Sequence, residues 1–238
     1  MDRLTIILVD GLVFASWLFL ISVGLTVIYG VLRILNIAHG SLYALGAFTG
    51  AVLVIEYLEK GMWPVGSYLV LVGAAIVVGI VAGPLIERGV LRWMYGRDEV
   101  LQLLATYAIF LILEDVIRLV WGDQSFRPFT PYALLGQFTI GGISYPKYFL
   151  LLFGAAVLSG LLLWLFLNRS RFGRMVVSVI HDPEISTAMG INLTRVYVVT
   201  FSVGAALAAL GGAATAPMIS VVPGIAAEVI VVAFAVVV

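Results

Sequence analysis

Three ionisable side chains, Glu114, Asp115 and Arg118, interrupt a stretch of the chain that is otherwise almost entirely apolar. On a helix, Glu114 and Arg118 lie on one face, at i and i+4 with the acid first, which is the favourable order for an ion pair. The spacing therefore predicts a neutralised intramembrane ion pair. A second interpretation stays open, because such groups are also typical of the proton relays and substrate contacts of ion-coupled carriers.

A second group of polar and aromatic side chains lies around residues 31–40, a segment too apolar for a solvated loop and too polar for lipid. Irregular backbone survives at membrane depth only where protein or water surrounds it. We therefore expect a broken helix that lines a cavity, with donors, acceptors and aromatic faces that suit a zwitterion with an apolar side chain. The predicted translocation path consists of Tyr29, Arg33, Asn36, His39 and Tyr43.

The sequence contains no pattern that is typical of an enzyme. It has no cysteine, and its two histidines, His39 and His181, do not form a metal-binding pattern. Lys60 and Lys147 are followed by Gly and Tyr, so neither belongs to the G-x-x-x-x-G-K-[ST] loop that cradles phosphates. We expect no catalytic residue, no metal and no cofactor. Energy for uphill transport would come from an ion gradient or from a separate ATPase subunit.

Composition decides what kind of fold positions these residues. The 238 residues are 63% hydrophobic and 11% charged, with a mean hydropathy of +1.16 and no net charge. Soluble chains contain about 25% charged residues, so an ordinary soluble enzyme and a nucleic-acid binder are both excluded. Since a spanning helix needs roughly 20 apolar residues, the sequence predicts an all-α polytopic membrane protein with a single domain over residues 1–238. Its six full spans are Thr5–Gly30, His39–Leu58, Gly66–Glu87, Val100–Trp121, Lys147–Leu167 and Val196–Ala216, followed by a truncated seventh at Ile225–Val238.

The basic residues predict the orientation of these spans. Eight Lys and Arg residues fall in one set of alternate connections and four in the other, and the richer side is cytoplasmic by the positive-inside rule. The N-terminus is then extracytoplasmic, as is the connection 121–146. Within that connection, Gln137–Tyr145 is typical of a small β-hairpin that turns on two glycines.

The cytoplasmic connection 168–195 carries the signals of a short helix. Asp182 suits the N-cap, Glu184 complements the helix dipole and Gly190 suits the stop. Because an isolated helix of about two turns is not stable in water, we expect a groove of a cytoplasmic partner to hold it, with the membrane interface as the alternative. The contacts would be made by an apolar face that has no core of its own to fill: Ile185, Ala188 and Met189.

Two segments resemble a known family. Residues 24–43, which read GLTVIYGVLRILNIAHGSLY, are very similar to the start of the LivH-type permeases of branched-chain amino-acid ABC importers. Residues 171–192, from the sequence Arg-Phe-Gly-Arg to the sequence Met-Gly-Ile-Asn, resemble the cytoplasmic coupling loop of the same family. The two motifs occur in family order and the spans between them fit, so the resemblance covers essentially the whole chain.

The resemblance implies a permease subunit in a bacterial cytoplasmic (inner) membrane. Its partners would be a second related permease, two cytoplasmic ATPase subunits that dock on the coupling loop, and an extracytoplasmic substrate-binding protein. The resemblance implies that members of the family continue past the position of Val238, so the permease domain is expected to be incomplete at its C-terminus. The expected substrate is a branched-chain or hydrophobic amino acid. Two alternatives remain: a permease of the same family for urea or short amides, and a self-contained ion-coupled secondary transporter.

Overall fold

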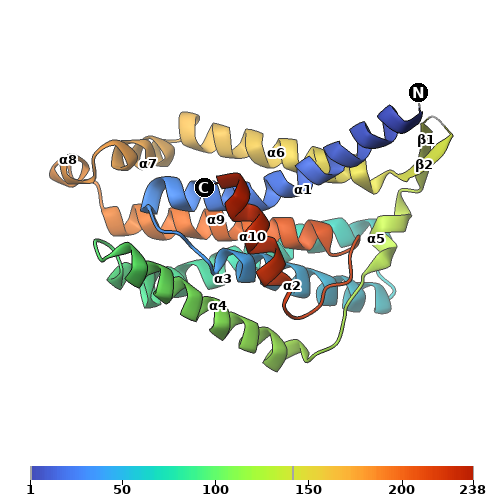
Figure 1. Cartoon of the computed structure of the whole chain (residues 1–238), viewed down its shortest axis with the longest axis horizontal. Coiled ribbons are helices and arrows are strands. Elements are labelled where there is room, and N and C mark those ends of the chain that lie inside the picture. Colours follow the sequence, from blue (N-terminus) through green and yellow to red (C-terminus); the bar gives the residue numbers. More distant parts are fainter. Residues whose placement is uncertain (1, 141, 238) are drawn as a thin grey trace.

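The computed structural model describes residues 2–140 and 142–237 and shows an all-α polytopic protein with one small sheet (Figure 1). Gly141, in the predicted turn of the hairpin, and Val238 lie outside the described residues. The long helices are α1 (Asp2–Leu32), α2 (His39–Glu59), α3 (Ser67–Gly89), α4 (Glu99–Trp121), α6 (Tyr148–Arg169) and α9 (Leu193–Thr215). The shorter elements are α5 (Phe129–Leu134), α7 (Arg171–His181), α8 (Pro183–Ala188), α10 (Ile225–Val237), the strands β1 (Gln137–Ile140) and β2 (Ile143–Pro146), and the single turns η1 (Pro64–Gly66) and η2 (Leu91–Trp93).

The six predicted spans are confirmed in number and order. In the described part of the chain, six helices are long and apolar enough to cross a membrane, with η1 and η2 extending α3 at its two ends. The apolar helix α10 has 13 residues, which correspond to about 20 Å. It packs against α1 and α2 and lies obliquely across the bundle (Figure 1).

Helix α9 runs through the middle of the bundle and packs against α1, α2 and α3 (Figure 1). Small residues permit this close approach. Gly46 of α2 lies on the backbone of Ala209, and Gly24 of α1 faces the carbonyl of Gly204, so that a Cβ at either glycine would overlap α9. Contacts between such small residues are what holds membrane helices together, since lipid gives little hydrophobic drive for their association.

The two ends of the bundle differ in what they carry (Figure 1). The start of α1, helix α5 and the β-hairpin gather at one end, which we call the hairpin end. Helices α7 and α8 and the connection from α3 to α4 lie at the opposite end, which we call the α8 end. The hairpin pairs Ile140 with Ile143 and Gln137 with Pro146, which confirms the predicted two-stranded element.

The predicted break between the first two spans is also confirmed. Helix α1 stops where Arg33 adopts a left-handed conformation with φ of 54°, and residues 33–38 are non-helical and largely buried. Figure 1 shows this segment returning into the bundle before α2 begins. Thr106 of α4 holds it, since its hydroxyl contacts the carbonyl of Leu35 at 3.0 Å and the N–H of Ile37 at 3.3 Å. Protein thus satisfies two backbone groups of the irregular segment, as irregular backbone at membrane depth requires.

Candidate functional site

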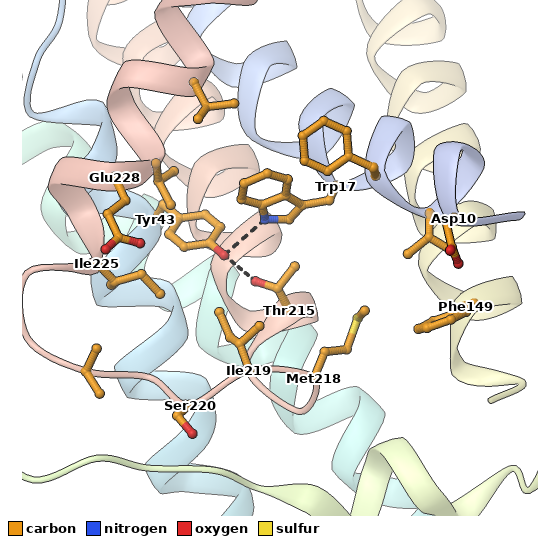
Figure 2. A pocket seen from close by; sticks show the side chains of 15 residues that line it. Asp10, Trp17, Tyr43, Phe149, Thr215, Met218, Ile219, Ser220, Ile225 and Glu228 are labelled. Atoms are coloured by element: carbon orange, nitrogen blue, oxygen red, sulfur yellow. Dashed lines mark hydrogen bonds between the residues drawn. The ribbon is translucent and has the colours of Figure 1, made fainter. Parts of the chain in front are cut away.

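A cavity of about 610 Å³ opens near the hairpin end, between α1, α2, α6 and the segment from the end of α9 through α10 (Figure 2). Its walls are mostly apolar. Phe14, Trp17, Tyr43 and Phe149 contribute aromatic faces, and Asp10 and Glu228 contribute carboxylates. In Figure 2 the two acids lie on opposite sides of the space. A volume of several hundred Å³ with mostly apolar walls and a few polar groups is characteristic of small-molecule sites.

A hydrogen-bonded group from three helices closes one side of this cavity. The indole Nε1–H of Trp17 on α1 donates to the hydroxyl of Tyr43 on α2, which is also hydrogen-bonded to the hydroxyl of Thr215 on α9 (Figure 2). Thr215 further contacts the carbonyls of Gly211 and Gly212. Because the Tyr43 side chain is fully buried, this group closes the cavity on that side, and we call it the Tyr43 wall.

Two fully buried polar side chains, Asn36 and His39, precede Tyr43 in the sequence and lie between it and the α8 end. His39 lies one turn before Tyr43 on α2, and its Nε2 is 2.9 Å from the carbonyl of Ile21. Its Nδ1 and both polar atoms of the Asn36 side chain have no hydrogen-bond partner in the described structure. Burying such groups unpaired costs about 1–3 kcal/mol each. Packing alone therefore does not explain these two side chains, which we call the polar line.

A smaller, more polar cavity of about 330 Å³ lies beyond this line, near the α8 end. Tyr29, Gly30 and Arg33 at the end of α1 line it, together with Glu99 and Gln102 at the start of α4. Arg33 is exposed there. Its left-handed conformation is uncommon for a residue with a side chain and is a form of local strain that concentrates at functional sites.

The structure does not place the five predicted path residues around one cavity. Tyr29 and Arg33 line the cavity at the α8 end, Tyr43 lines the cavity at the hairpin end, and Asn36 and His39 are buried between them. Sequence reasoning missed the residues that complete the larger cavity, in particular Asp10, Thr215 and Glu228. Asp10 and Glu228 could have been recognised in the sequence, because each is a lone acid within a long apolar segment.

Glu114 has a different partner from the one predicted. Its carboxylate is buried, and Oε2 accepts a hydrogen bond of 3.0 Å from the backbone N–H of Gly224, next to the start of α10. Arg118 is exposed one turn later. No ion pair joins Glu114 to Arg118 within the described residues, because the carboxylate turns toward α10 while Arg118 stays outside the packed face.

The short helix predicted in the connection 168–195 is present as α8. The Asp182 carboxylate accepts from the N–H of Ile185 at 2.9 Å, and Gly190 ends the turn with φ of +85°, as the sequence predicts. The Ser186 hydroxyl binds that of Ser178 at 2.9 Å and fixes α8 on α7. The apolar face remains open to solvent, since Ala188 is exposed and Ile185 and Met189 are 63% and 79% exposed.

Helix α7 was not anticipated. Ser170 caps it by accepting from the N–H of Gly173 at 2.7 Å, and Val176 and Val179 bury one face against the bundle. The capping serine and the spacing of the two valines were the signal in the sequence. Helices α7 and α8 together form a structured element at the α8 end, which we call the α7–α8 element.

Comparison with known proteins shows which family the chain belongs to. Residues 7–238 match the family model described as the permease component of the branched-chain amino acid transport system. The chain is 30% identical to the high-affinity branched-chain amino acid transport system permease protein BraD of Pseudomonas aeruginosa over 211 residues, 85% of this chain and 67% of the relative. It is 28% identical to LivH of Escherichia coli K12 over 210 residues, again 85% and 67%.

A more distant relative, the probable permease protein LivH of Methanocaldococcus jannaschii, is 27% identical over 243 residues, 96% of this chain and 71% of the relative. No solved structure matches the chain. The family match covers nearly all of the sequence, and its relatives are named as transport permeases rather than enzymes. The chain belongs to the family of permease components of branched-chain amino acid transport systems.

Proposed function

We propose that this chain is the permease subunit of an ABC importer for branched-chain amino acids, forming part of the translocation path and docking a separate ATPase. Its family and its relatives are permease components of such systems. The observation that carries the proposal beyond the family is the exposed apolar face of α8, which Asp182 and Ser186 hold in place without covering it. A helix fixed in this way is preorganised for a partner groove.

The translocation path in this proposal links the two cavities. Substrate enters the larger cavity, passes the Tyr43 wall when that wall opens, and crosses the buried polar line of His39 and Asn36. It leaves through the cavity lined by Tyr29 and Arg33. The unpartnered polar atoms of His39 and Asn36 support this route, because a passing zwitterion supplies the hydrogen bonds that the closed structure lacks.

The ATPase contact is assigned to the α7–α8 element. Ile185, Ala188 and Met189 would enter a groove of the ATPase, while Asp182, Glu184 and Gly190 keep the helix in shape. The complete importer would contain a second related permease, two ATPase subunits and an extracytoplasmic substrate-binding protein. It would lie in a bacterial inner membrane, with the N-terminus and the hairpin end outside and the α8 end in the cytoplasm.

The test of this function is the variant Ala188→Glu. A charge on the apolar face of α8 would be buried unpaired in the groove, which is costly. We expect this variant to insert normally but to lose ATP-driven leucine uptake in proteoliposomes and recovery of the ATPase in pull-downs. The control is Thr187→Glu, which puts the same charge on the opposite face of α8 and should keep both.

Three outcomes would each overturn a part of the proposal. Normal ATPase recovery and uptake by Ala188→Glu would remove α8 as the docking site. Uptake that follows an ion gradient and ignores ATP would favour a secondary transporter that uses Glu114. Competition by urea or short amides, without competition by leucine, isoleucine or valine, would favour the alternative of a permease for urea or short amides.

A further inference from the structure

Two exposed carboxylates interrupt otherwise apolar helices. Asp10 is the one charged residue in the span Ile6–Leu32, and Glu228 is the one charged residue in α10, and both side chains are exposed. An acid that faces lipid costs about 2.5–3.5 kcal/mol on insertion scales. Such residues therefore face protein or a water-filled space. Both of them line the larger cavity, so this cavity is the space that solvates them.

The remaining walls of the cavity match a cation with an apolar body. Phe14, Trp17, Tyr43 and Phe149 present aromatic faces, which attract cations through their quadrupoles. None of the described residues that line the cavity is Lys, Arg or His, so this part of the cavity wall gives the two acids no cationic partner. The Tyr43 hydroxyl already has partners in Trp17 and Thr215, which leaves the two carboxylates as the strongest free acceptors.

We propose that this cavity is a hydrated binding site for the ammonium end of a ligand with an apolar side chain. Asp10 and Glu228 attract the ammonium group, and the aromatic walls cover the hydrocarbon part. The identification of that ligand as an amino acid rests on the function proposed above. The cation that could meet the carboxylate of such a ligand, Arg33, lines the other cavity. Among the described residues that line the two cavities, the guanidinium of Arg33 near the α8 end is thus the one cationic group.

The chain offers a direct probe of this cavity because it contains no cysteine. Ser220 is exposed and lines the cavity, so Ser220→Cys places a single thiol there. In the full importer in proteoliposomes, we would compare its modification rate by a cationic and an anionic methanethiosulfonate of similar size. Acidic walls should favour the cationic reagent by about tenfold or more. A thiol at Gln137, exposed on the hairpin, sets the reference ratio.

Neutralising the acids tests their role. Glu228→Gln in the Ser220→Cys background should bring the ratio of rates toward the Gln137→Cys reference, and Asp10→Asn should do the same independently. If either variant fails to assemble, the other one decides the result. A thiol at Ser220 that reacts with neither reagent, or with both at the reference ratio, would overturn the proposal, because the cavity would be dry or uncharged.

Ligand protection identifies the recognised end. Leucine and isopentylamine should slow modification of the Ser220→Cys thiol, whereas 4-methylpentanoate, which keeps the carboxylate and lacks the ammonium group, should not. Equal protection by 4-methylpentanoate would contradict the assignment. Leucine uptake is recorded in the same vesicles, so the two proposals fail separately. Loss of ATP dependence refutes the importer, and loss of the charge preference with normal uptake refutes the ammonium site.

Discussion

The Glu114 carboxylate on α4 accepts a hydrogen bond from the backbone N–H of Gly224, 110 residues later in the sequence and 3.0 Å away. A second link between the same regions is the bridge in which Phe126 and Val221 exchange backbone hydrogen bonds of 3.0 and 2.9 Å. The segment after α4 and the segment after α9 are thereby tied together at the start of α10. A buried side chain of α4 thus helps to position α10, although α4 is not its neighbour in sequence.

Substitution of Glu114 separates its charge from its hydrogen bond. Glu114→Gln keeps an oxygen that accepts from Gly224, so we expect near-normal uptake and thermal stability. Glu114→Leu leaves the Gly224 N–H without its partner, at a cost of about 1–3 kcal/mol. Thermal unfolding in detergent and leucine uptake in proteoliposomes measure the two effects. A carrier that uses Glu114 for protons would behave differently, because Glu114→Gln alone would already abolish uptake.

Tyr43→Phe removes the hydroxyl at the centre of the Tyr43 wall. Trp17 and Thr215 then each lose a hydrogen-bond partner, and we expect a loss of about 1–3 kcal/mol in the free energy of unfolding. In a double-mutant cycle with Thr215→Val, the two costs should be non-additive by about 0.5–3 kcal/mol, as for side chains in direct contact. Strict additivity in thermal unfolding would mean that the hydrogen bond between Tyr43 and Thr215 contributes nothing.

Asn36→Leu tests the polar line because it should leave stability unchanged or higher while it lowers transport. Both polar atoms of Asn36 are buried without partners, so an apolar side chain of similar size should be neutral or stabilising. The same change removes the groups that a passing zwitterion would bind. We expect an unchanged or higher unfolding temperature, normal ATPase recovery, and uptake reduced by about tenfold or more, the equivalent of about 1.4 kcal/mol. Normal uptake would make the segment 33–38 structural.

Gly46→Ala tests the close approach of α2 and α9. The added methyl group would overlap the backbone of Ala209, and overpacking of this kind costs about 1–3 kcal/mol. Gly73→Ala is the matched control, because a Cβ at Gly73 of α3 meets nothing within 4 Å, and it should be neutral or stabilising by up to about 1 kcal/mol. The unfolding temperature should therefore fall for Gly46→Ala and stay unchanged or rise for Gly73→Ala.

The proposed orientation is tested with two single cysteines. Met189→Cys lies on α8 at a position that is 79% exposed, and Gln137→Cys lies on the hairpin at the opposite end of the bundle. In intact cells, a membrane-impermeant maleimide should label Gln137→Cys, and it should label Met189→Cys only after permeabilisation. The reverse pattern would invert the topology and place α8 where no cytoplasmic ATPase reaches it.

Local features of the sequence predicted the fold well. The six spans follow from length and apolarity, and the ends of α8 follow from the cap at Asp182 and the glycine at 190. Helix α7 was missed because it is too short and too polar for a span, although its buried Val176 and Val179 follow the one-sided pattern of a surface helix. Its cap at Ser170 could have been recognised.

The candidate site was harder to predict because its parts are distant in sequence. Asp10 and Glu228 meet around one cavity only through the packing of α1 and α10 on the bundle. The partner of Glu114 was sought four residues away on the same helix, whereas it is the backbone of Gly224. Inside a membrane both faces of a helix are apolar, so hydrophobic periodicity does not reveal which residues face a cavity.

Helix α9 joins α8 directly to the Tyr43 wall. It begins just after α8, across residues 189–192, where Asn192 caps it, and it ends at Thr215 in the Tyr43 wall. Its 23 residues make a rod of about 34 Å, and close contacts with α1, α2 and α3 along its length prevent it from bending alone. We therefore expect a displacement applied at α8 to reach Thr215 through this rod, so that α8 and the Tyr43 wall would move as linked parts of one body.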